Sequence, residues 1–108
     1  MCVLLQENIG IVLWKHGKLA EAMELYQEVL RVRVATLGPE HPDVGNTYYN
    51  ITCAHSLAGS ISDALANFES AVSAGWPAGY SNRQHAESDP DLDNIRGHEQ
   101  FQRILARI

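Results

Sequence analysis

The sequence has little positive charge and no long apolar run. Its 108 residues hold eight Lys and Arg against thirteen Asp and Glu, which gives a formal net charge of −5. Nucleic-acid backbones and anionic lipid surfaces both attract clustered positive charge, so we expect no nucleic-acid partner and no membrane partner. No stretch approaches the roughly 20 apolar residues that a membrane-spanning helix needs.

Cysteine is also scarce. Cys2 and Cys53 make no disulfide framework, and the apolar start from Met1 to Trp14 lacks the basic leader of a signal peptide. We therefore expect a protein of a reducing compartment, with the cytoplasm as its location.

Recognisable metal and catalytic motifs are missing. There is no Cys-x-x-Cys and no His-Glu-x-x-His, and Cys53 and His55 point to different sides of a predicted helix. Asp89, Asp91 and Asp93 alternate as in a calcium loop, but the glycine and the closing glutamate of such a loop do not fall at the required positions. We interpret these aspartates as a solvated turn, and we predict no metal site, no cofactor and no catalytic residue.

An internal repeat is what the sequence does contain. A shift of 42 positions aligns Gly17 with Gly59 and Asn8 with Asn50. The same shift aligns small or apolar residues, namely Ile9 with Ile51, Ala22 with Ala64, Tyr26 with Phe68, and Val29 with Ala71. Packing demands matches of this kind, so they indicate two copies of one structural unit.

Each copy predicts a helix, a tight turn and a second helix. Gly17 and Gly59 end the first helix of each copy, as a residue in the left-handed conformation does. Apolar residues at helical spacing form four stripes that should make the core. The stripes are Leu5, Ile9, Val12 and Leu13; Leu19, Met23, Tyr26 and Leu30; Val44, Tyr48, Ile51 and Ala54; and Ile61, Ala64, Leu65, Phe68 and Val72.

These residues carry a family resemblance. Gly10, Gly17, Ala22 and Tyr26 have the spacing of a tetratricopeptide helical hairpin. The usual period of that family is about 34 residues, and the longer period here, with the linker LGPEHPDV, is similar to the repeats of kinesin light chain. In that linker, Pro42 suits the first turn of the next helix.

The resemblance implies an all-α fold in which antiparallel helical hairpins stack as a tetratricopeptide-type solenoid with a C-terminal capping helix. We expect a single domain over residues 1–108, with one repeat over residues 3–44, a second over 45–75 and a capping segment over 76–108. In that segment either Asp89 or Asp91 caps a turn, and Trp76 packs the tail onto the fourth helix. An apolar stripe of Phe101, Ile104, Leu105 and Ile108 then closes the stack, which would otherwise expose its last apolar face.

The N-terminal helix has no comparable cap. Val3, Leu4 and Leu5 begin it at once. Two explanations stay open: the chain is the end of a longer array, or it covers this edge by self-association through the N-terminal helix.

A candidate peptide-binding surface follows from the resemblance, because the first helix of each tetratricopeptide hairpin lines the concave face. By helical spacing the residues on this surface are Leu4, Asn8, Ile11 and Lys15 from the first helix, and Asn46, Asn50, Cys53 and Leu57 from the third, with Tyr49 beside them. We expect this surface to be distinct from the core stripes. Trp14 lies beside the first stripe, and the sequence leaves open whether it packs or faces the groove.

The two repeated asparagines are the central residues of this surface. Each amide has two N–H donors and an acceptor, so it can hold one peptide unit of an extended ligand. The resemblance to kinesin light chain implies this role for Asn8 and Asn50. The alternative is that both are solvated polar residues.

We therefore predict a protein–protein interaction module, not an enzyme, that binds an extended peptide or a partner helix in its concave groove as part of a larger scaffold or adaptor. The first alternative is a purely structural assembly or oligomerisation element. A remote alternative is a small metal- or thiol-dependent hydrolase.

Overall fold

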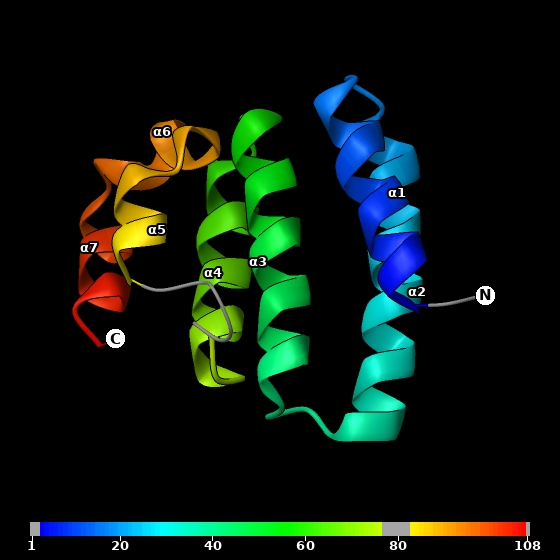
Figure 1. Ribbon diagram of the computed structural model, residues 1–108. Coiled ribbons are helices and arrows are strands. Elements are labelled where there is room, and N and C mark those ends of the chain that lie inside the picture. Colours follow the sequence, from blue (N-terminus) through cyan, green and yellow to red (C-terminus); the bar gives the residue numbers. More distant parts are fainter. Residues whose placement is uncertain (1–2, 77–82, 108) are drawn as a thin grey trace.

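The computed structural model describes residues 3–76 and 83–107, and of residues 3–8, 83 and 85 it describes the backbone alone. Every regular element in these ranges is helical, which confirms the all-α prediction (Figure 1). The elements are α1 (Val3–Lys15), α2 (Leu19–Leu37), α3 (Pro42–Leu57), α4 (Ile61–Ser73), α5 (Arg83–Ser88), the 3₁₀ turn η1 (Pro90–Leu92), α6 (Asp93–Arg96) and α7 (Glu99–Leu105). None of the helices described is long and apolar enough to cross a membrane.

The helices form two hairpins side by side, α1 with α2 and α3 with α4, followed by the tail (Figure 1). Gly17 and Gly59 take positive φ angles of 80° and 79°, as predicted for residues that end the first helix of each hairpin. At the first turn, the backbone N–H of Lys18 donates to the carbonyl of Leu13, which is the bond that a left-handed glycine allows after a helix.

The first hairpin packs through Tyr26, which is fully buried on α2. The Trp14 indole N–H donates to the Tyr26 hydroxyl at 2.7 Å. The backbone of Gly10 lies close to the same ring, because a Cβ added at Gly10 would be only 3.0 Å from a ring carbon. Leu13 of the predicted stripe packs against the core, but Ile9 and Val12 are 39% and 55% exposed, so their place in the stripe was wrong. The physical reason is that α1 turns its glycine and tryptophan toward Tyr26.

The two hairpins are joined by a short linker and by polar contacts between α2 and α3. Pro42 occupies the first turn of α3 as predicted, and the His41 ring accepts a hydrogen bond from the Asp43 N–H at 3.0 Å. Arg33 on α2 donates to the Thr47 hydroxyl at 2.8 Å and to the Asp43 carbonyl at 3.2 Å.

Four aromatic rings make the core of the second hairpin and the tail. Phe68 on α4 is fully buried, and the ring of Phe101 on α7 stacks on it at 4.9 Å between centroids. Trp76 stacks on Tyr49 of α3 at 4.6 Å with the planes 6° apart, and it meets Phe68 edge-on at 5.8 Å. The tail therefore packs on both helices of the second hairpin, because α7 lies on α4 while η1 and α6 lie on α3.

Candidate functional site

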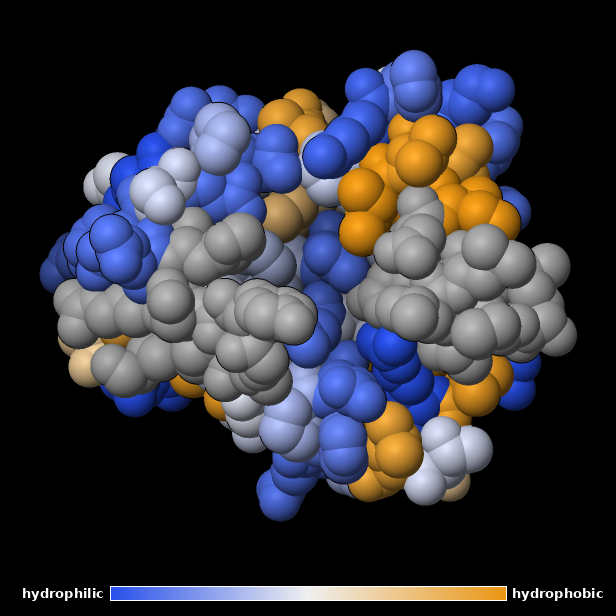
Figure 2. Space-filling view, in the orientation of Figure 1, coloured by the Kyte–Doolittle hydropathy of each residue, from blue (hydrophilic) through white to orange (hydrophobic). Residues whose placement is uncertain are grey.

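A groove lies where α1, α3 and η1 meet, and it encloses about 470 Å³. We call it the α1–α3 groove. It is lined by Ile11, Trp14 and Lys15 from α1, by Tyr49, Asn50 and Cys53 from α3, and by Asp89, Pro90 and Asp91 from the tail. Figure 2 shows hydrophilic surface in the furrow between the two halves of the molecule, with hydrophobic surface over one end of the α1–α2 hairpin.

The α1 wall combines apolar and cationic groups at helical spacing. Ile11 is half-buried, while Trp14 is 5% exposed and held in place by its bond to Tyr26. Lys15 is exposed, and its ammonium lies 5.7 Å from the centre of the Trp14 ring, within the range of a cation–π contact. The sequence left open whether Trp14 packs in the core or faces the groove, and in the structure it does both.

The α3 floor lies deeper than expected. Tyr49 and Cys53 are 5% and 3% exposed and belong to the hydrophobic core, so the prediction that they face away from the core was wrong. Both are covered by the tail, which the helical period of α3 does not reveal. Asn50, between them on the same helix, stays half-buried and lines the groove.

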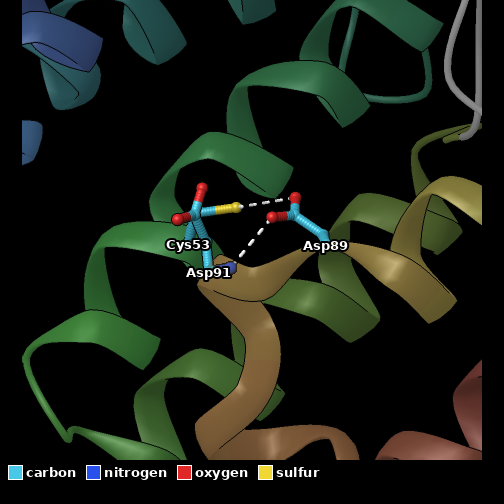
Figure 3. A group of neighbouring side chains, drawn as sticks. All are labelled: Cys53, Asp89 and Asp91. Atoms are coloured by element: carbon cyan, nitrogen blue, oxygen red, sulfur yellow. Dashed lines mark hydrogen bonds between the residues drawn. The ribbon is translucent and has the colours of Figure 1, made fainter.

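Asp89 fixes the tail to this floor, as Figure 3 shows in part. One oxygen of its carboxylate accepts hydrogen bonds from the Tyr49 hydroxyl at 2.6 Å and from the Cys53 thiol at 3.9 Å. The other accepts from the Asp91 N–H at 2.9 Å, which makes Asp89 the cap of η1. Of the two predicted caps it is therefore Asp89, and the predicted turn is confirmed. Asp93 is exposed as expected, but Asp89 and Asp91 are half-buried, so the interpretation of these two as solvated was wrong.

Their surroundings favour the protonated forms of Cys53, Tyr49 and Asp91 over the ionised forms. Burial, followed by the charge of Asp89, raises the pKa of the Cys53 thiol well above its usual value. Burial also raises the pKa of Tyr49. The pKa of Asp91 is raised by burial and by the neighbouring Asp89 carboxylate, against a lowering influence from Lys15. A thiol held protonated is a poor nucleophile, so this arrangement does not favour thiol catalysis.

Cys53, Asp89 and Asp91 are also the described residues that come closest to a metal-binding set (Figure 3). Their sulfur and oxygen atoms lie within 4.8 Å of one another, and such a set of three would suit Zn²⁺ with water as a fourth ligand. The thiol would first have to lose its proton, which its raised pKa opposes, and Asp89 already accepts three hydrogen bonds. Hydrogen bonding within the protein accounts for the cluster.

The groove gathers part of the predicted peptide-binding surface. Ile11, Lys15, Tyr49, Asn50 and Cys53 line it. Two further predicted residues lie outside its lining: Asn46 is half-buried, and Leu57 is 44% exposed. The side chains of Leu4 and Asn8 lie outside the described residues.

The sequence did not indicate that tail residues line this groove. Asp89, Pro90 and Asp91 complete the groove, and the sequence showed them as a capped turn. That signal identifies the local conformation, but it does not say which surface the turn will meet. The helical spacing of Phe101 and Ile104 indicates that the tail docks, yet not where.

Comparisons with known proteins agree with this architecture. Residues 1–74 match the family model described as tetratricopeptide repeat. The chain is 30% identical over 99 residues to a protein of Arabidopsis thaliana whose name describes it as chloroplastic, an alignment that covers 92% of this chain and 27% of that protein. The chain thus spans about a quarter of the length of this relative. No solved structure matches significantly. Because the family model covers well over half of the chain, this protein belongs to the tetratricopeptide repeat family.

Proposed function

We propose that the chain is a protein-interaction module, without catalytic activity, that binds an extended peptide segment of a partner in the α1–α3 groove. The observation that carries the proposal is the groove itself, whose lining combines Asn50 with apolar side chains and charged groups. Ligand pockets combine apolar walls with a few polar groups that fix orientation, and this lining has that composition. Membership of a family of protein-binding repeats supports the same function.

Asn50 is the residue on which this proposal depends. It is half-buried on the floor and lines the groove. An amide in this position can donate to and accept from one peptide unit of a ligand. We also propose Asn8 as a ligand contact, and this rests only on its alignment with Asn50 in the 42-residue repeat.

The test is selection of a random peptide library on the immobilised chain, followed by affinity measurements on synthesised peptides. We expect Asn50→Ala to weaken binding about tenfold, because truncation removes up to two hydrogen bonds and leaves ligand groups unpaired. Asn67→Ala is the matched control, since Asn67 bonds to the carbonyl of Asp63 on its own helix α4 and does not line the groove. If the selected peptides bind Asn50→Ala and Asn67→Ala equally well, the binding surface lies outside the groove.

A second candidate function is assembly, which one specific observation favours. Ile9 and Val12 are large apolar side chains on α1 that are 39% and 55% exposed. We propose that α1 also makes a contact with another folded unit, either a second copy of this chain or a neighbouring repeat.

We also propose a likeness to kinesin light chain repeats and a cytoplasmic location. The likeness to kinesin light chain repeats rests on the linker and the period. A cytoplasmic location rests on cysteine usage, while the name of the Arabidopsis relative places that protein in the chloroplast.

A further inference from the structure

The tail end of the α1–α3 groove is acidic and is held rigidly. Asp89 is anchored by Tyr49, Cys53 and the Asp91 N–H, so its carboxylate has little freedom to move. The neighbouring Asp91 side chain is half-buried in the same lining. Two carboxylates are therefore presented together at one end of a groove whose other wall carries Ile11 and Trp14.

This pairing concentrates negative charge where a ligand can reach it. Burial, followed by the charge of Asp89, raises the pKa of Asp91. Lys15 offsets part of this rise from the α1 wall, but its side chain is exposed and its ammonium sits over Trp14. An added cation at Asp91 would gain from both carboxylates, and partial burial would reduce its screening by water and salt.

We infer that the peptide held in the α1–α3 groove presents a Lys or Arg side chain whose charged end binds Asp91, where the charge of Asp89 adds to the attraction, with its methylene stem packed along Ile11 and Trp14. The inference rests on the proposed function and names its ligand chemistry. Lysine and arginine combine an apolar stem with a charged head, and the groove offers surfaces for both in that order. A basic side chain also binds without deprotonating Cys53, which a metal ion at this place would require.

The first experiment uses simple probes. N-acetyl-lysine methylamide and N-acetyl-norleucine methylamide share the same four-carbon stem, and the second lacks the ammonium. Each is titrated into the isotope-labelled full chain while NMR signals of the Trp14 indole and the Asn50 amide are followed. We expect the lysine probe to bind about tenfold more tightly than the norleucine probe, a preference lost in Asp91→Asn and kept in Glu24→Gln. Glu24 is an exposed acid on α2, so its variant changes the net charge equally without altering the groove.

The second experiment uses the peptides selected for the proposed function. Those that depend on Asn50 should carry a basic residue at one fixed position, and its replacement by norleucine or citrulline should cost about tenfold in affinity for the parent chain but not for Asp91→Asn. Selected peptides that depend on Asn50 but tolerate these replacements would overturn the inference and leave the proposed function standing. Failure to select any Asn50-dependent peptide would contradict both.

A metal titration separates the competing explanation. Calorimetry with ZnCl₂ should show no stoichiometric binding that depends on Cys53 and Asp91. Tight binding of one Zn²⁺ that is lost in both Cys53→Ser and Asp91→Asn would assign the acidic end to a metal ion and overturn the inference.

Discussion

At the scale of single residues, Gly45 shows how a close approach can reverse a general rule. A glycine inside a helix usually costs about 1 kcal/mol relative to alanine. At Gly45, however, a Cβ would lie 2.8 Å from the Trp76 nitrogen and 2.9 Å from the Ala71 carbonyl oxygen, both of which are backbone atoms. The absence of a side chain is what lets the chain after α4 cross α3 here.

We therefore expect Gly45→Ala to destabilise the protein by about 1–3 kcal/mol, the usual cost of overpacking, despite its better helix propensity. Thermal or urea unfolding measures the change. Gly97→Ala is the control: Gly97 has a φ of −78°, and a Cβ there would meet nothing within 4 Å. Equal stabilities for the two variants would mean that α3 and the chain near Trp76 do not approach each other closely in solution.

Asp91 gives a pH-dependent prediction with a defined sign. Its pKa in the folded protein is raised above the usual 3.8, so the folded state binds its proton more tightly than the unfolded chain. Ionised Asp91 therefore costs stability above its folded pKa, and this cost disappears as the pH falls toward 3.8. Asp91→Asn should be more stable than the parent at pH 7, by less than about 1 kcal/mol because the group is half exposed, and no more stable near pH 3.

Melting temperatures of the two proteins between pH 3 and pH 7 measure this difference, with Glu24→Gln as the charge-matched control. The same substitution should weaken ligand binding in the groove while it raises the stability of the fold. A loss of stability in Asp91→Asn at pH 7 would show that the ionised carboxylate stabilises the fold, which contradicts a raised pKa of Asp91 in the folded protein.

At the scale of elements, buried side chains hold the tail on the second hairpin. Phe101 of α7 is fully buried and stacks on Phe68, while Ile104 and Leu105 are each 3% exposed. On α6 and η1, Ile95 and Leu92 are fully buried, and the Asn94 amide donates to the Ser56 carbonyl of α3 at 2.6 Å. The tail thus covers the face of the second hairpin that a further repeat would otherwise cover.

Phe101→Ala should cost about 3–5 kcal/mol, because it removes a buried ring and leaves a cavity beside Phe68. That is a large part of the stability of a small domain, so a clear fall in melting temperature is expected. Gln100→Ala, a change at an exposed neighbour on the same helix, should lower it far less. An unchanged melting temperature for Phe101→Ala would mean that α7 is not docked in solution.

At the scale of the whole molecule, the exposed apolar residues of α1 bear on assembly. Val12 is 55% exposed, so its replacement by glutamate should leave the fold intact. If α1 contacts a second copy, the parent chain should show concentration-dependent association in analytical ultracentrifugation, and Val12→Glu should reduce it. Leu37→Glu is the control, since Leu37 is similarly exposed at 43% but ends α2. A parent chain that stays monomeric at high concentration would contradict self-association.

The sequence by itself determined the repeat, the helices and their turns. Gly17 and Gly59 end helices because only glycine takes a positive φ without steric cost, and that is a local property. Most of the core was likewise predictable: Tyr26, Ile51 and Phe68 are fully buried, as helical spacing and the 42-residue shift indicated. Helical period and turn chemistry act over a few residues, so a sequence expresses them directly.

Only the tertiary structure decided what the groove contains. Asp89 meets Tyr49 and Cys53 across 40 and 36 positions of sequence, and this contact buries two residues that α3 alone would leave exposed. Trp14 similarly belongs to the core because its indole reaches Tyr26 on the next helix, while Ile9 and Val12 are turned away. Apolar spacing tells which residues can share a helix face, but shape and hydrogen bonding between distant segments select the face that is buried.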